Sequence, residues 1–100
     1  MKPQDLTFYI ATHNRCAYLE ETLESLRAQT AQGFRWIVGD NASTDDTPQR
    51  LEKWEARGVR VCRAESRLEP WENIKRGADL AETPWVVLFH DDDLLHPRFV

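Results

Sequence analysis

Only two cysteines occur in the chain, Cys16 and Cys62, and no long apolar run is present. Two widely separated cysteines match no metal-binding spacing and exclude a disulfide framework, so we predict reduced thiols in a cytosolic protein. The N-terminal stretch MKPQDLTFYIAT has too short an apolar run for a secretory signal, and no segment approaches the ~20 apolar residues of a membrane span. We therefore expect a cytoplasmic protein and leave open a peripheral attachment to the inner membrane face.

The net charge is only -4 at pH 7, which argues against a broad basic surface and hence against a nucleic-acid partner. Apolar residues make up 41% of the chain and charged residues 30%, the composition of a folded globular protein. A chain of 100 residues can bury one compact core, so residues 1–100 are predicted to form a single domain. The last residues, HPRFV, predict a helix that opens at Pro97 and is not continued, so we expect a domain that is incomplete at its C-terminal end.

Short stretches rich in β-branched and aromatic residues alternate with helical patterns. The last stretch is apolar throughout, which predicts a strand covered on both faces. This order indicates an α/β fold, a Rossmann-like parallel sheet with flanking helices and the strand order third, second, first, fourth. The predicted strands are Leu6–Ala11, Phe34–Gly39, Val59–Arg63 and Trp85–Phe89, and the helical patterns cover residues 17–30, 47–58 and 69–84.

The helical patterns also predict which side chains are buried. Asn14 is placed to cap the first helix, Thr47 to cap the second, with Asp45 as a further residue for its start, and Gly58 to end the second. Gly77 inside the third helix costs about 1 kcal/mol relative to alanine, which indicates close packing there. The residues predicted to face the core are Leu19, Leu23 and Leu26, then Leu51 and Trp54, then Ile74, Ala78 and Ala81, together with the remaining tryptophans Trp36, Trp71 and Trp85.

Polar residues follow three of the predicted strands: THNR the first, DNASTDDT the second and HDDD the fourth. In parallel sheets ligands bind outside the carboxyl ends of the strands, so these loops are expected to converge on one site. Thr12, His13 and Arg15 are predicted to line it, with Arg15 available for phosphate. Asp40 and Asn41 come too early to cap a helix and are predicted to hydrogen-bond a ligand such as a pyrimidine base.

Asp91, Asp92 and Asp93, the acidic triplet, place like charges side by side, and each repulsion can reach the order of 1 kcal/mol near low-dielectric protein. Mg²⁺ and Mn²⁺ accept one or two carboxylates and take their other ligands from water and phosphates. The triplet therefore indicates a divalent metal that holds a diphosphate. Capping of a helix that begins near Leu94 or Pro97 is the alternative.

Three stretches, FYIATHNRCAYLEETLESLRAQT, FRWIVGDNASTDDTPQRLEKW and WENIKRGADLAETPWVVLFHDDDLLHP, resemble in order and spacing the nucleotide-sugar-binding half of family 2 glycosyltransferases, which have the GT-A fold. The family's Asp-x-Asp motif falls on Asp91 and Asp93. The resemblance implies that Asp93 coordinates Mg²⁺ or Mn²⁺ and that Asp91 or Asp92 contacts the ribose or the water shell of the metal. It also implies a donor pocket formed by Ala11, Thr12, His13 and Arg15, by Asp40 or Asn41 at the base, and by Asn73 beside Lys75 and Arg76.

For a whole enzyme, the resemblance implies metal-dependent, inverting transfer of a sugar from a nucleotide-diphosphate sugar, and we expect a UDP-sugar as the donor. The implied acceptor is a saccharide or a lipid-linked molecule in cell-envelope polysaccharide synthesis. The family's general base lies downstream of the Asp-x-Asp motif, so it is expected beyond Val100. We thus expect this chain to supply the donor and metal site, to be inactive alone and to self-associate through an uncovered sheet face. A noncatalytic nucleotide-sugar-binding relative and a receiver-like Mg²⁺-binding signalling domain are the alternatives.

Overall fold

The structure, a computed structural model, describes residues 2–100 and contains a four-stranded parallel sheet in the order β3-β2-β1-β4. The predicted fold class and strand order are therefore confirmed. A short 3-10 helix precedes the first strand. The elements are β1 (Leu6–Thr12), α1 (Cys16–Arg27), β2 (Arg35–Asp40), α2 (Thr47–Ala56), β3 (Arg60–Arg63), α3 (Pro70–Leu80) and β4 (Trp85–His90).

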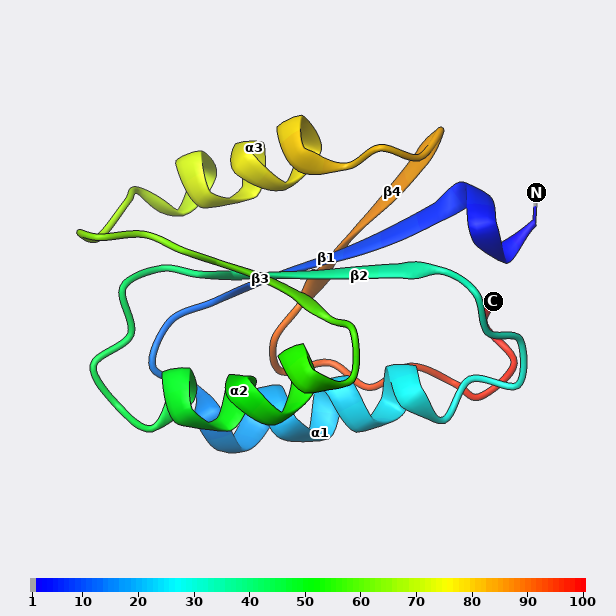
Figure 1. Cartoon of the computed structure of the whole chain (residues 1–100), viewed down its shortest axis with the longest axis horizontal. Coiled ribbons are helices and arrows are strands. Elements are labelled where there is room, and N and C mark those ends of the chain that lie inside the picture. Colours follow the sequence, from blue (N-terminus) through cyan, green and yellow to red (C-terminus); the bar gives the residue numbers. More distant parts are fainter. Residues whose placement is uncertain (1) are drawn as a thin grey trace.

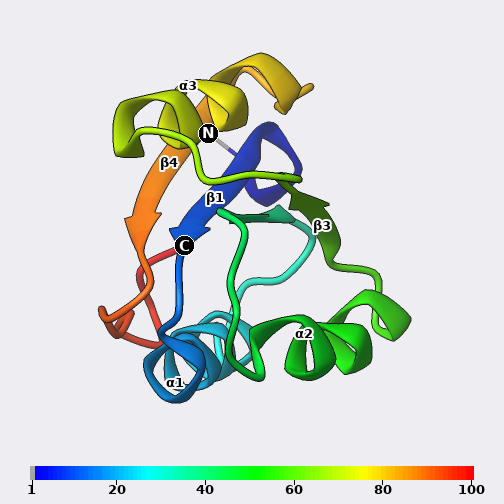
Figure 2. The ribbon, with the colours of Figure 1, turned by 90° about the vertical axis from the view of Figure 1, so that its left-hand side faces the viewer.

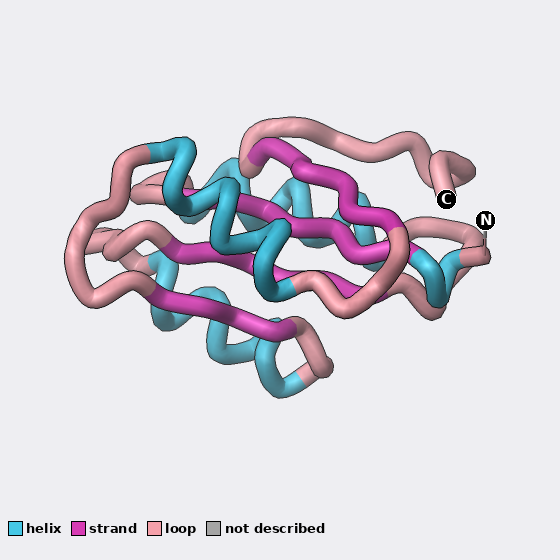
Figure 3. The backbone as a smooth tube through the Cα atoms, turned by 90° about the horizontal axis from the view of Figure 1, so that it is seen from above, coloured by secondary structure: helices cyan, strands magenta, loops and turns pink. Residues whose placement is uncertain are grey.

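The helices form two layers, one on each face of the sheet. In Figure 1, α1 and α2 lie below the sheet and α3 lies above it. Figure 2, an end view, shows the same three layers, and Figure 3 shows α3 crossing over the strands. Each helix connects two parallel strands, and this arrangement brings the carboxyl ends of the strands to one edge of the sheet.

The main core lies between the sheet and the α1/α2 layer. Phe8 and Ile10 on β1 and Val38 on β2 are fully buried, and Phe8 and Ile10 share one face because alternate residues of a strand point to the same side. They pack against the leucines predicted to face inward, Leu19, Leu23 and Leu26 of α1, and against Leu51 and Trp54 of α2. Gly58 follows α2 with a φ of 99°, the left-handed conformation that ends a helix, as predicted.

Tyr9 joins the opposite face of the sheet to α3. Its ring lies against Gly39 and Gly77, and a Cβ atom at either glycine would overlap it. Its hydroxyl donates to the carbonyl oxygen of Asn73 at 2.8 Å, and burial raises the pKa of the phenol, so it stays protonated. The predicted close packing at Gly77 is confirmed, and the partner is this aromatic ring.

The predicted inward face of α3 is wrong. The buried residues of this helix are Asn73 and Gly77, while Ile74 is 38% exposed and Ala78 is exposed. The Tyr9 ring occupies the space beneath the helix, so only a residue without a side chain fits over it. This contact, which no helical periodicity reveals, rotates the apolar side of α3 toward solvent.

Two of the four tryptophans are also outside the core. Trp54 is buried and Trp36 half-buried, but Trp71 and Trp85 are 64% and 60% exposed. Leu88 on β4 is exposed as well. The prediction that this strand is covered on both faces is therefore wrong for residues 2–100, where β4 forms an edge of the sheet.

The helix predicted to open at Pro97 is absent from the described part of the chain. Residues after β4 form turns and extended segments that run along α1. The backbone N–H of Thr30 donates to the carbonyl oxygen of Pro97 at 2.9 Å. Helix capping therefore does not account for the acidic triplet within residues 2–100, since no helix follows it there.

We predict that Gly77→Ala lowers the free energy of unfolding by at least about 2 kcal/mol, because overpacking against the Tyr9 ring outweighs the better helix propensity of alanine. Urea denaturation followed by circular dichroism measures this change. In a Tyr9→Leu background the same substitution should cost less. Equal costs in both backgrounds would contradict the proposed clash.

Candidate functional site

The ends of β1, β2 and β4 meet at one edge of the sheet. In the strand register Thr12 pairs with Asp40, and Ala11 pairs with His90. Beyond these ends lies a crevice of about 510 Å³. It is lined by Ala11, Thr12, His13, Arg15, Asn41, Arg67, Pro70, Asn73, Ile74, His90, Asp91 and Asp92.

Nearly all the residues predicted from the sequence come together in this crevice. The exceptions are Asp40 and Asp93, which are not part of its lining. Asp40 is 1% exposed at the end of β2, and Asp93 is exposed at the surface beside the other two aspartates. The carboxyl-end rule for parallel sheets therefore located the crevice from three loops far apart in the sequence.

The acidic triplet divides into one buried and two exposed carboxylates. Asp91 is 8% exposed and accepts a hydrogen bond from the hydroxyl of Thr12 at 2.8 Å. Arg15 lies at the start of α1, and its Nη1 is 3.2 Å from Oδ2 of Asp92 and 3.8 Å from Oδ1 of Asp91. This guanidinium offsets part of the repulsion between the adjacent carboxylates, although solvent weakens the pairing because the Arg15 side chain is half exposed.

Asp40 and Asn41 are held by neighbouring backbone groups. Asp40 accepts the N–H of Ser43 through Oδ1, while Oδ2 is buried without a hydrogen bond from the described residues and lies 3.8 Å from Arg63. The Asn41 amide donates to the carbonyl of Leu68 at 2.9 Å and accepts the N–H of the same residue at 2.6 Å. Asn41 thus fixes the shape of the crevice wall before any ligand binds, and Asp40 fixes the turn that follows β2.

Asn14 connects the two loops that follow β1 and β2, and the prediction that it caps α1 is wrong. Its backbone φ of 52° places it before the helix, whose N-cap is Arg15. Its side-chain oxygen accepts the N–H groups of Thr44 at 2.7 Å and Asp45 at 3.2 Å. The left-handed conformation, which asparagine tolerates, directs the amide away from α1 and toward this loop.

Thr47 does not cap α2 either. It is the first residue of the helix, and its buried hydroxyl has no hydrogen-bond partner among residues 2–100. Asp45 takes the capping role two residues earlier, where its carboxylate accepts the N–H groups of Thr47 at 2.9 Å and of Cys16 at 3.4 Å. One carboxylate therefore lies at the N-termini of both α1 and α2, where the helix dipoles favour negative charge.

Asn73 lines the crevice but its polar atoms are engaged on the inner side. Its amide donates to the carbonyl of Gly39 at 3.0 Å, and its side-chain oxygen accepts from Arg76 at 2.6 Å. Arg76 also donates to the carbonyl of Cys62 at 3.2 Å. These contacts join α3 to β2 and β3, so they hold the crevice wall in place.

Four lining residues were missed from the sequence: Arg67, Pro70, Ile74 and His90. Arg67 adds a cation to the crevice that Asp91 and Asp92 line, from a loop between β3 and α3 that carries no motif of its own. His90 directly precedes the triplet, at the end of β4. Its position at a strand end, next to three carboxylates, was the available signal for including it.

The acidic triplet suits a metal that binds together with its ligand. Among residues 2–100, no three His, Cys, Asp or Glu side chains gather closely enough to hold an ion by themselves. Mg²⁺ and Mn²⁺ need only one or two carboxylates when phosphates and water complete the shell, and hard oxygen donors are what the triplet offers. The donor set therefore fits such an ion only with a diphosphate in the crevice.

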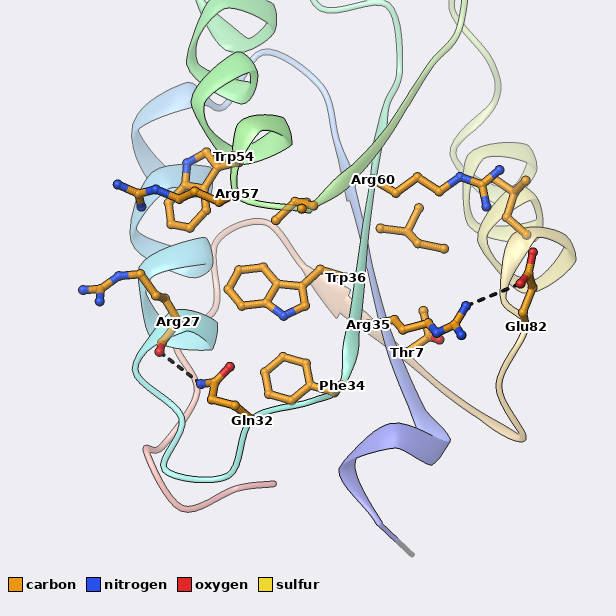
Figure 4. Close-up of a pocket in the computed structure, with 14 residues that line it drawn as sticks. Thr7, Arg27, Gln32, Phe34, Arg35, Trp36, Trp54, Arg57, Arg60 and Glu82 are labelled. Atoms are coloured by element: carbon orange, nitrogen blue, oxygen red, sulfur yellow. Dashed lines mark hydrogen bonds and ion pairs between the residues drawn. The ribbon is translucent and has the colours of Figure 1, made fainter.

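A second cavity of about 510 Å³ lies at the opposite end of the strands (Figure 4). Its floor is formed by Phe34 and Trp36, whose rings stack 5.6 Å apart. Arg35 pairs with Glu82 at 3.4 Å, and Arg57 lies over the Trp54 ring at 5.1 Å. Figure 4 shows these cations on opposite sides of the Trp36 ring, so they do not converge on one ligand.

Residues 7–100 match the family model described as glycosyl transferase family 2, and the chain belongs to this family. Thus the family predicted from the three quoted stretches is confirmed.

Three known proteins illustrate the similarity. Abequosyltransferase RfbV of Salmonella typhimurium is 32% identical over 95 residues, which are 90% of this chain and 28% of the relative. S. aureus TarS 1-349 in complex with UDP shares 27% identity, with a TM-score of 0.86 over 98% of this chain and 29% of the TarS 1-349 chain. A mannosyltransferase from Pyrobaculum calidifontis in complex with GDP-Man and Mn²⁺ shares 23% identity, with a TM-score of 0.83 over 94% and 29% of the two chains.

The chain therefore spans under a third of the length of each of these proteins. Within the described residues, the helices are too short or too polar to cross a membrane.

We predict that Asp45→Asn lowers the free energy of unfolding by about 1 kcal/mol at pH 7, because a carboxylate accepts its two backbone hydrogen bonds roughly twice as strongly as a neutral group, and an amide keeps only one accepting oxygen. Burial opposes ionisation of Asp45, but hydrogen bonds from Thr47 and Cys16 outweigh it and lower its pKa. Because folding lowers this pKa, the stabilisation is present above the ordinary carboxyl pKa of about 4 and is lost as the pH falls through the folded-state value.

Urea denaturation of both proteins between pH 7 and pH 3 measures the difference, which should shrink toward the acid end. Asp46→Asn is the matched control, since it removes the same charge from the α2 N-cap, whose side chain makes no capping hydrogen bond. A loss for Asp46→Asn as large as that for Asp45→Asn would contradict the assignment.

Proposed function

We propose that these residues form the donor side of a metal-dependent glycosyltransferase that transfers a sugar from a nucleotide-diphosphate sugar to an acceptor hydroxyl. The observation that carries the proposal is the crevice at the carboxyl ends of β1, β2 and β4, which combines Asp91 and Asp92 of the acidic triplet with the cations Arg15 and Arg67. Family membership supports the reaction class, and the UDP in the TarS complex supports a nucleotide donor.

In this proposal different side chains contact different parts of the nucleotide-sugar donor. Thr12, His13 and Ala11, at the end of β1, form the floor beneath the nucleotide. Asp40 or Asn41, at the end of β2, determines which base is accepted, and a UDP-sugar is our first choice. The side-chain nitrogen and oxygen of Asn41 are both hydrogen-bonded to the backbone of Leu68, so Asn41 would contribute through the shape that it gives the crevice wall.

Asp93, with Asp91, would hold Mg²⁺ or Mn²⁺ against the diphosphate, and Asp92 would contact the ribose or the metal's water shell. When bound, the metal would offset the charge that develops on the departing nucleoside diphosphate. The Mn²⁺ in the mannosyltransferase complex supports this choice of ion. Thr12 keeps Asp91 in place, and Arg15 and Arg67 add positive charge beside the phosphates.

The transfer itself would be inverting, with a carboxylate that accepts the proton of the acceptor hydroxyl as it attacks the anomeric carbon. We assign this base and the acceptor site, for a saccharide or a lipid-linked sugar, to residues outside 1–100. The carboxylates of the crevice are Asp91 and Asp92, and Arg15 contacts both. Family membership argues against the receiver-like alternative.

We predict that nucleoside diphosphates bind weakly without a divalent metal and that Asp93→Ala removes the metal-dependent part of the affinity. Unneutralised carboxylates repel a diphosphate, so the metal is needed to reverse the sign of the local charge. Calorimetric titration of UDP, GDP and dTDP with Mn²⁺ and with chelator measures both states.

Asp79→Ala serves as the control, since Asp79 is exposed on α3 and pairs with Lys75 away from the crevice. Its affinities should equal those of the wild type. Equal nucleotide affinity with metal and with chelator would instead show that the triplet is not a metal site.

We also predict that residues 1–100 alone transfer no sugar, because we assign the general base to residues outside this range. They should tend to self-associate, because Trp85 and Leu88 are exposed on an edge strand. The protein at the full length its gene encodes should transfer sugar from a labelled donor. An assay of both, following transfer and hydrolysis to free sugar, tests this division. A rate for the 100-residue chain near that of the full-length protein would place the base within these residues.

A further inference from the structure

Polar side chains of α1, and of Gln29 just after it, hold the backbone of residues 93–100, a segment outside any helix or strand. The hydroxyl of Thr22 donates to the carbonyl oxygen of Asp93 at 2.7 Å, and the hydroxyl of Ser25 accepts the N–H of Leu95 at 3.1 Å. Gln29 donates to the carbonyl of His96 at 2.8 Å. Thr22 and Ser25 lie three residues apart on one face of α1, and Gln29 follows two residues after the helix ends at Arg27.

Thr22 is unusual within this group because it is fully buried and contacts a predicted metal ligand. A threonine hydroxyl inside a helix commonly bonds back to a carbonyl one turn earlier. Here the hydroxyl reaches across to Asp93 instead. The carbonyl of this residue is therefore fixed from the inside of the protein, while its carboxylate stays exposed.

Ser25 extends the same arrangement by one turn. Its hydroxyl donates to the carbonyl of Thr22 at 2.7 Å and accepts the N–H of Leu95. Two backbone groups on either side of Leu94 are thus held by α1. Holding both sets the direction in which the chain leaves the acidic triplet, and with it the direction of the Asp93 side chain.

We propose that Thr22 is a positioning residue for the divalent metal, a role that rests on the proposed function. It acts through Asp93: by fixing the Asp93 carbonyl it keeps this carboxylate beside Asp91, which Thr12 holds from β1. Metal ligands fixed by hydrogen bonds from a surrounding shell bind more tightly, because less freedom is lost when the ion arrives. Thr22 itself does not touch the ligand.

The test is Thr22→Val, which keeps the shape of the side chain and removes the donor. With UDP or GDP present, Mn²⁺ affinity should fall about tenfold, as is common when a residue supporting a metal ligand is lost. Electron paramagnetic resonance of free Mn²⁺, on the protein at the full length its gene encodes, measures this without relying on activity. Thr22→Ser retains the hydroxyl and should restore the affinity to within about twofold.

Thr7→Val is the matched control. Thr7 is another fully buried threonine, at the start of β1, and its hydroxyl pairs with that of Thr83 at 2.6 Å. Its loss should lower stability but leave Mn²⁺ affinity unchanged. An unchanged affinity in Thr22→Val, or an equal fall in Thr7→Val, would overturn the positioning role.

If Thr22→Val is too unstable to purify, Ser25→Ala replaces it and should also weaken Mn²⁺ binding; no change in that variant would overturn the proposal. Wild-type protein that binds no Mn²⁺ in the presence of either nucleotide would instead remove the proposed metal site and the inference with it. The two failures are therefore distinguishable.

Discussion

Parallel pairing of β1 with both β2 and β4 is the constraint on which the crevice depends. It brings Thr12 beside Asp40 and Ala11 beside His90. The short reach of the Thr12 hydroxyl to Asp91 is possible only because these strands end together. A shift of the pairing by one residue would turn every side chain to the other face and separate the acidic triplet from its support.

Much of this arrangement could be predicted from the sequence, because it follows from alternation and strand order. Short apolar stretches separated by helical patterns allow few topologies, and parallel strands end at a common edge. Leucines at helical spacing in α1 identified the core face correctly. Asp91 follows the end of β4 directly and Arg15 lies three residues after β1, so their place in the crevice needed no tertiary information.

The errors share a different cause, which is contact between residues far apart in the chain. Asn14 and Thr47 are residue types that commonly cap helices, but Asp45 supplies one carboxylate oxygen to each of the two helix N-termini. The Tyr9 ring determines which side of α3 is buried, and no local pattern in α3 records a ring on β1. Arg67 enters the crevice because Asn41 fixes the adjacent Leu68, another contact invisible to spacing.

The two edge strands of the sheet differ in how readily each could pair with a further strand. At one edge, β3 is only four residues long and carries arginines at both ends, which discourages a further strand. At the other, β4 offers six residues with Trp85 and Leu88 uncovered. A further strand, whether from the same polypeptide or from another molecule, is therefore favoured beside β4, next to the acidic triplet. A strand added there would also form one side of the crevice.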